Sequence, residues 1–174
     1  MTPLPPLSSI YDLTDLSDSG AEIALAANAG QRARLAEWAG VDAVDRFEAT
    51  VDLRRLSANR FVFEALLDAR IVQSCVVTLE PVRSHLERSV SRELRLVRRD
   101  ERRRRQHPSI DVVEEEGPEE IESPFYDLTA PLLEEFVLAI DPYPRASGVV
   151  FELPVSVEPA ESPFGVLKGL KAGK

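Results

Sequence analysis

The sequence predicts a single α+β domain in which an antiparallel sheet of about four to six strands has two helices packed on one face. Two stretches, 47–53 and 61–71, alternate apolar and polar residues as half-buried strands do. A third stretch, 128–140, places apolar residues at helical spacing. The chain has 174 residues, of which 44% are hydrophobic, and this is enough to bury one core.

The two alternating stretches are expected to pair as a hairpin. Turn-forming residues at 57–60 separate them and predict a connection longer than the two-residue minimum. The second strand continues toward Cys75. Pro81 has no backbone N–H to donate, so it should end the pairing or lie on an edge. The core-facing residues of the two strands are then Phe47, Ala49, Val51 and Leu53, followed by Phe61, Phe63, Ala65, Leu67, Ala69 and Ile71.

The flanking segments predict further elements. Residues 21–27 alternate as a short strand, and Asn28 is suited to cap a helix over 30–39. Residues 82–97 fit a helix and a strand alike. We favour a strand for them, because the segment follows a turn and would return along the preceding strand.

The helix over 128–140 is the clearest of the predicted elements. Its apolar stripe suits a helix that covers a sheet. Asp127 or Thr129 can cap its start, and the run Asp141-Pro-Tyr-Pro144 ends it.

Three regions divide the chain, and the second contains a long charged loop. Residues 1–20, rich in Pro, Ser and Asp, are expected to be a flexible arm, and 21–158 to form the α+β domain. Within the domain, 98–123 is an arginine run followed by an acidic run without apolar periodicity, which predicts a long mobile loop. Residues 159–174 form a C-terminal tail with the only lysines.

Charge and composition narrow the class of protein. The chain has 21 Lys and Arg against 30 Asp and Glu, a net charge of −9, which disfavours indiscriminate binding to nucleic acid. A single cysteine forms no internal disulfide. The sequence shows neither a signal-peptide pattern nor an apolar run that spans a bilayer. We therefore expect a cytoplasmic protein without a membrane association; the sequence leaves its oligomeric state open.

The cysteine stands in the sequence Cys75-Val-Val-Thr78, which has the form of a zinc knuckle without its second cysteine. A structural zinc site needs about four N or S ligands, and this chain offers one cysteine and two histidines. We expect no metal and no other cofactor. A catalytic thiol paired with His85 is the less favoured alternative to a cysteine packed in the core.

Three segments in this order resemble the YceD family, whose members are associated with accumulation of 23S ribosomal RNA. They are Cys75–Val82, Asp127–Pro144 and Ser162–Lys171. Many members have Cys-x-x-Cys at the position of Cys75–Thr78, and in this chain Thr78 replaces the second cysteine. The resemblance implies a non-enzymatic factor in biogenesis of the large ribosomal subunit. It implies structural roles for Cys75, Thr78, Leu79, Glu80, Pro81, Asp141, Pro142 and Pro144.

Two segments are candidate contact sites for the implied partners, which are 23S ribosomal RNA, a large-subunit ribosomal protein or an assembly factor. The arginine run offers charge for RNA phosphates, and its members are Arg98, Arg99, Arg102, Arg103, Arg104 and Arg105. The tail offers apolar anchors with lysines beside them, namely Phe164, Leu167, Lys168, Leu170 and Lys171. The alternatives are a solvated loop, a tail that packs on its own core, and an adaptor that binds protein without RNA.

Overall fold

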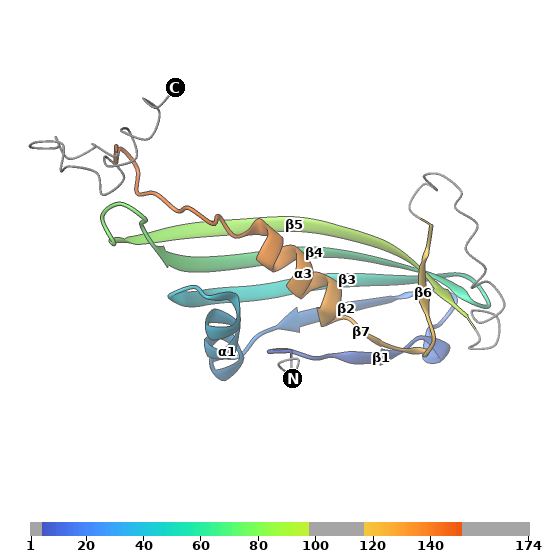
Figure 1. Cartoon of the computed structure of the whole chain (residues 1–174). Helices are drawn as coiled ribbons and strands as arrows, with labels where there is room; N and C mark the ends of the chain where they lie inside the picture. The colour runs from blue at the N-terminus through green and yellow to red at the C-terminus, as the bar shows by residue number, and fades with distance from the viewer. Residues whose placement is uncertain (1–4, 98–116, 151–174) are drawn as a thin grey trace, which may run out of the picture.

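A computed structural model describes residues 5–97 and 117–150 of the chain (Figure 1). It contains a five-stranded sheet in the order β2-β3-β4-β5-β6, a separate pair β1-β7, and two α-helices. The sheet strands are β2 (Ala21–Ala26), β3 (Ala43–Ser57), β4 (Arg60–Ser74), β5 (Pro81–Leu96) and β6 (Glu119–Ile121). The remaining elements are β1 (Ile10–Asp12), β7 (Phe125–Asp127), α1 (Ala29–Ala39), α3 (Thr129–Ala139) and a 3-10 helix, Leu13–Asp15. The predicted α+β class, with a sheet of four to six strands, is confirmed.

Strand β4 is the centre of the sheet. It pairs antiparallel with β3 on one side and with β5 on the other, from Ser74↔Pro81 to Arg60↔Arg95. Residues 82–97 are therefore a strand for most of their length. The β3–β4 connection has only two residues, Ala58 and Asn59, which is shorter than the turn signals at 57–60 suggested.

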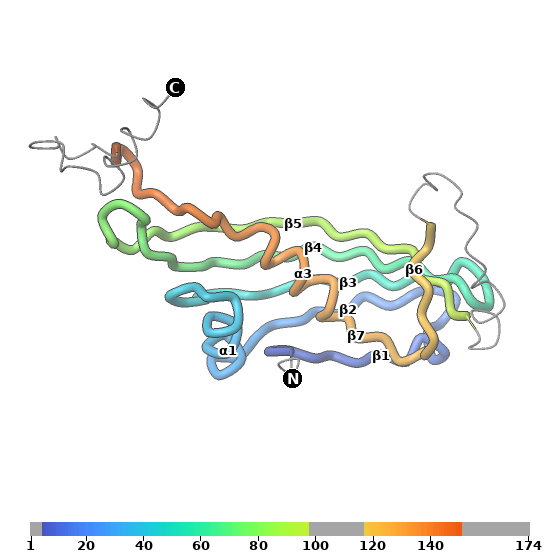
Figure 2. The backbone as a smooth tube through the Cα atoms, viewed as in Figure 1, coloured from blue at the N-terminus to red at the C-terminus, as the bar shows by residue number. Residues whose placement is uncertain are grey.

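Both helices pack against the face of the sheet that holds the buried residues (Figures 1 and 2). Helix α1 begins at a capping box between Asn28 and Gln31 and ends at Gly40, whose φ of 69° suits glycine. Helix α3 buries Phe136 completely, and its ring lies edge-on to Phe47 with ring centroids 5.4 Å apart. In the part of the chain that the structure describes, neither α-helix could span a bilayer, since each has 11 residues and a span needs about 20 apolar ones.

The expectation of a flexible arm over 1–20 is wrong for residues 5–20. Leu7, Leu13 and Leu16 are buried in the core, and β1 pairs antiparallel with β7. Arg55 from β3 donates hydrogen bonds to the carbonyls of Leu13 and Leu16. Apolar burial and these hydrogen bonds compensate the entropy of ordering the segment, so the domain begins well before residue 21.

The mobile loop predicted for 98–123 is wrong at its C-terminal end. Residues Glu119–Ile121 form β6, which pairs parallel with Leu94–Leu96 of β5, so the sheet is mostly rather than wholly antiparallel. Glu120 forms an ion pair with Arg95. Residues 98–116, and the tail predicted for 159–174, lie outside the described residues.

Asp127 connects the N-terminal segment to the start of α3 through hydrogen bonds to its carboxylate. Its carboxylate accepts hydrogen bonds from the Ser9 N–H at 3.0 Å, the Ser8 hydroxyl at 2.8 Å, and the N–H and hydroxyl of Thr129 at 3.0 and 2.7 Å. Burial by itself would raise the pKa of the Asp127 carboxyl. The hydrogen bonds from Ser9, Thr129 and Ser8 outweigh burial and hold the pKa below its ordinary value.

Replacing Phe136 should test the packing of α3 on the sheet. We expect Phe136→Ala to lower the free energy of unfolding by about 3–5 kcal/mol, because it leaves a cavity beside Phe47. Leu138→Ala on the same helix is the matched control, since Leu138 is 73% exposed; it should change stability by less than about 0.5 kcal/mol. Denaturant unfolding measures both, and equal losses would contradict the described orientation of α3.

Replacing Asp127 should change how stability depends on pH. A carboxyl whose pKa is lowered by folding stabilises the protein above its unfolded pKa, and this contribution is lost as the pH falls through the folded pKa. Asp127→Asn should therefore cost about 1 kcal/mol at neutral pH and flatten the loss of stability on acidification. Asp18→Asn, which removes an exposed carboxyl of the same segment, should do neither.

Candidate functional site

The turn between β4 and β5 is closed by its own backbone. The Cys75 N–H donates to the Glu80 carbonyl at 2.8 Å, and the Leu79 N–H donates to the Cys75 carbonyl at 2.9 Å. Leu79 has a φ of 61°, in the left-handed region that non-glycine residues rarely adopt. We call residues 75–80 the knuckle.

The chain after α3 returns to the knuckle. The Gln73 side chain donates to the Asp141 carbonyl at 2.9 Å, and the Val76 N–H donates to the Pro144 carbonyl at 2.9 Å. The Ala146 N–H points to the Cys75 sulfur, with 3.4 Å between the nitrogen and Sγ. Two segments about 70 positions apart in the sequence, each part of the YceD resemblance, therefore meet at one end of the sheet.

The Cys75 thiol has no exposed surface and lies in a ring of hydrogen-bond donors. The Thr78 side chain, the Ala146 N–H and the N–H groups of Thr78 and Val77 lower the pKa of Cys75 to about 6, from an ordinary value of 9.0. Desolvation raises the pKa of Cys75 by less than these hydrogen bonds lower it. The sulfur is covered by the turn and by the 144–146 segment and does not lie deep in the core. The environment of Cys75 therefore favours the thiolate over the thiol, but the sulfur is not accessible to solvent.

The knuckle end of the sheet exposes three large apolar side chains. Val76 is 47% exposed, Leu79 76% and Tyr143 70%. They lie on the two segments that the Val76–Pro144 hydrogen bond joins. We call these three side chains the knuckle patch; such a group suits contact with a partner.

The structure places some predicted site residues together and leaves others outside its range. The motif residues Cys75, Thr78, Leu79, Glu80, Pro81, Asp141, Pro142 and Pro144 all lie at or beside the knuckle. The candidate RNA-binding residues Arg98, Arg99, Arg102, Arg103, Arg104 and Arg105 lie outside the described residues, as do Phe164, Leu167, Lys168, Leu170 and Lys171 of the tail.

His85 is not the partner of Cys75. It pairs in register with Arg70, and its Nε2 lies 3.3 Å from an Asp68 carboxylate oxygen. Cys75 follows the last residue of β4 and lies five residues beyond Arg70, which corresponds to roughly 17 Å of extended chain. The geometry therefore rules out His85, the one histidine among the described residues, as a base for the thiol.

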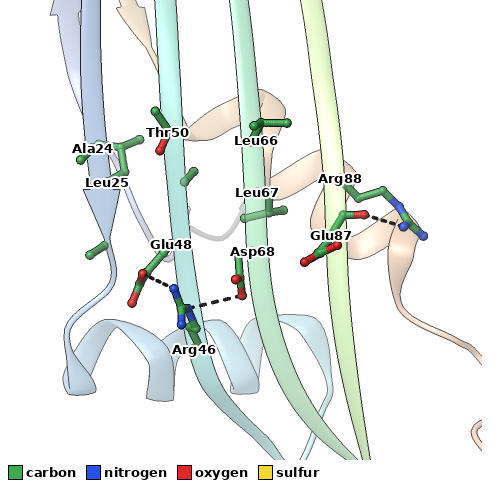
Figure 3. A pocket seen from close by; sticks show the side chains of 12 residues that line it. Ala24, Leu25, Arg46, Glu48, Thr50, Leu66, Leu67, Asp68, Glu87 and Arg88 are labelled. Atoms are coloured by element: carbon green, nitrogen blue, oxygen red, sulfur yellow. Dashed lines mark hydrogen bonds and ion pairs between the residues drawn. The ribbon is translucent and has the colours of Figure 1, made fainter.

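A second group of polar side chains, which the sequence reasoning missed, lies on the face of the sheet away from the helices. We call this face the open face. A shallow groove of about 510 Å³ there is lined by Arg46, Glu48, Leu66, Asp68 and Glu87, among others (Figure 3). Arg46 lies 2.7 Å from Glu48 and 3.4 Å from Asp68. The only signal in the sequence is that the charged members of this group occupy the polar positions of the alternating strands.

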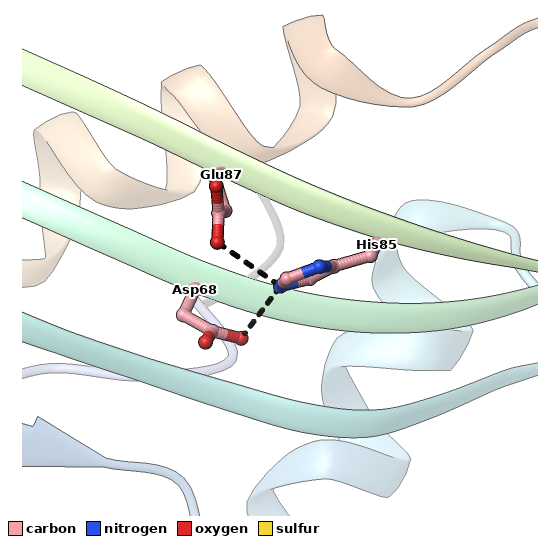
Figure 4. Close-up of side chains that lie close together, drawn as sticks. All are labelled: Asp68, His85 and Glu87. Atoms are coloured by element: carbon pink, nitrogen blue, oxygen red, sulfur yellow. Dashed lines mark hydrogen bonds and ion pairs between the residues drawn. The ribbon is translucent and has the colours of Figure 1, made fainter.

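Within residues 5–97 and 117–150, one group of three side chains has potential metal-ligand atoms close together. It consists of Asp68, His85 and Glu87, whose ligand atoms lie within 4.8 Å of one another (Figure 4). His85 and Glu87 are exposed, and Asp68 is partly buried. Cys75 is not a member of this group.

Replacing Thr78 should test what holds the Cys75 thiolate. Thr78→Val removes the hydroxyl and should raise the thiol pKa from about 6 toward its ordinary value of 9.0. Thr78→Ser retains the hydroxyl and should leave the pKa unchanged. The thiolate contribution to stability is fully present above the unfolded pKa of the thiol and is lost as the pH falls through the folded pKa. Because the three backbone N–H donors remain, Thr78→Val should lose part of this contribution at neutral pH. Ultraviolet absorbance of the thiolate against pH measures the shift, and identical titrations of the two variants would contradict it.

Comparisons of the chain with protein-family models, with curated proteins and with solved structures found no match. The membership of the YceD family therefore remains a prediction from the three sequence segments.

Proposed function

We propose that the protein is a non-enzymatic cytoplasmic factor that supports accumulation of 23S ribosomal RNA during biogenesis of the large ribosomal subunit. It would act by binding ribosomal RNA or a large-subunit ribosomal protein. The resemblance to the YceD family suggests the process. The knuckle supports the role of a binding protein, because two segments of that resemblance meet there beneath exposed apolar side chains.

Leu79 is the observation that carries this proposal. Its side chain is 76% exposed, and its backbone is in the left-handed region where glycine or asparagine is favoured. A leucine at this position is unfavourable for the isolated fold on both counts. Such strain is typical of positions that are retained for function, and burial of the leucine against a partner would compensate it.

The charges of the described surface favour a protein partner over RNA. Six described arginines form ion pairs with carboxylates, which compete with phosphates for them; these pairs are Arg46–Glu48, Arg54–Glu64, Arg60–Glu93, Arg83–Asp45, Arg92–Glu134 and Arg95–Glu120. An acid-rich body suits a basic ribosomal protein by charge complementarity. The RNA route rests on the arginine run at 98–105.

Replacing Leu79 tests the proposal in cells that lack the native copy. We expect Leu79→Asn to fold normally, because asparagine tolerates the left-handed region, and to reduce 23S relative to 16S ribosomal RNA. The control is Leu138→Asn, which changes a leucine that is 73% exposed on α3 and should restore normal levels. Normal 23S levels in the cells without any copy would overturn the proposed process.

The partner is identified by crosslinking and affinity purification of the same variants. Loss of one large-subunit protein from Leu79→Asn, with no RNA crosslink in the wild type, supports the protein route. An RNA crosslink that disappears when Arg102, Arg103, Arg104 and Arg105 are reversed in charge supports the RNA route instead.

A further inference from the structure

We propose that Asp68, His85 and Glu87 form a binding site for a divalent transition-metal ion on the open face of the sheet. The three side chains come from the adjacent strands β4 and β5 and converge above them (Figure 4). His85 Nε2 lies 3.3 Å from Asp68 Oδ1 and 3.6 Å from Glu87 Oε1. This site is distinct from the knuckle and does not depend on the function proposed above.

The distances suit a common ion. Two ligand atoms at about 2.1 Å from one metal lie roughly 3.0–3.4 Å apart at octahedral or tetrahedral angles. The separations about His85 Nε2 are close to this range. Glu87 is exposed, so a small change of its rotamer suffices to complete the set. Three protein ligands leave the remaining positions of the ion for water.

The register of the sheet gives the site its charge. Three carboxylates lie side by side across neighbouring strands. Glu48 of β3 pairs with Asp68 of β4, and Asp68 pairs with Glu87 of β5. Carboxylates directly opposite one another repel. Arg46 and Arg70 offset part of this charge, since Arg70 pairs in register with both Arg46 and His85. Arg46 lies closer to Glu48, at 2.7 Å, than to Asp68, at 3.4 Å. It can therefore remain paired with Glu48 when Asp68 turns to an ion.

The ligand types indicate which ion is bound. One imidazole nitrogen with two carboxylate oxygens suits Zn²⁺, Mn²⁺ or Co²⁺. Mg²⁺ prefers oxygen ligands and keeps its waters, so it should bind more weakly. We take Zn²⁺ as the probe.

Isothermal titration of the full chain with zinc chloride tests the site. We expect one Zn²⁺ per chain with a dissociation constant in the micromolar range, and a rise in Tm on adding the metal. His85→Ala, Asp68→Asn and Glu87→Gln should each weaken binding about tenfold or more. These side chains are outside the core, so circular dichroism should show the variants folded.

Two matched controls separate a built site from general affinity. His107→Ala removes the only other histidine, and Asp52→Asn removes another open-face carboxylate that lies outside the group of three. Both should bind Zn²⁺ within about twofold of the wild type. The proposal is overturned if the wild type gives no binding heat, or if His85→Ala and His107→Ala bind equally well, which would indicate an adventitious ion only.

Discussion

The alternation of side chains along β4 is the constraint on which the other elements depend. Its inward residues, from Phe61 to Ile71, are almost fully buried, while its outward residues are polar or exposed apart from Val62 and Val72. A slip of one residue against β3 or β5 would exchange the two faces and place Asp68 and Arg70 in the core. The apolar face therefore fixes the register of both neighbours, and that register positions every cross-strand contact of the sheet.

The ends of the sheet follow from this register. With Ser74 opposite Pro81, the chain must turn within the knuckle, and the left-handed Leu79 completes the turn. The segment after α3 then adds its hydrogen bonds to Val76 and to the Cys75 sulfur. Because α3 is anchored at Phe136, its exit is directed to this end of the sheet, and the two motif segments meet.

The open face carries the polar half of the same alternation. Its charges are arranged across strands rather than along them, so Glu48, Asp68 and Glu87 are neighbours although they are about 20 positions apart in the sequence. Several ion pairs offset the negative charge of this face. Arg46 lies beside Glu48 and Asp68, and His85 lies beside Asp68. The knuckle patch, by contrast, has exposed apolar side chains. The charged open face and the apolar knuckle patch are therefore two separate surfaces.

The sequence by itself determined the hairpin, both helices and the α+β class, because alternation and helical spacing are local properties that buried faces impose. It could not decide the conformation of 82–97, since Leu86, Val90 and Leu94 are four residues apart and fit one face of a helix or of a strand equally. Pairing with β4 decided that this segment is a strand. Only the tertiary structure revealed the ordered N-terminal segment, whose Leu13 and Leu16 show no period of their own, and strand β6. Only the cross-strand register brought Asp68, His85 and Glu87 together, because contacts between strands depend on distant pairing that no local pattern records.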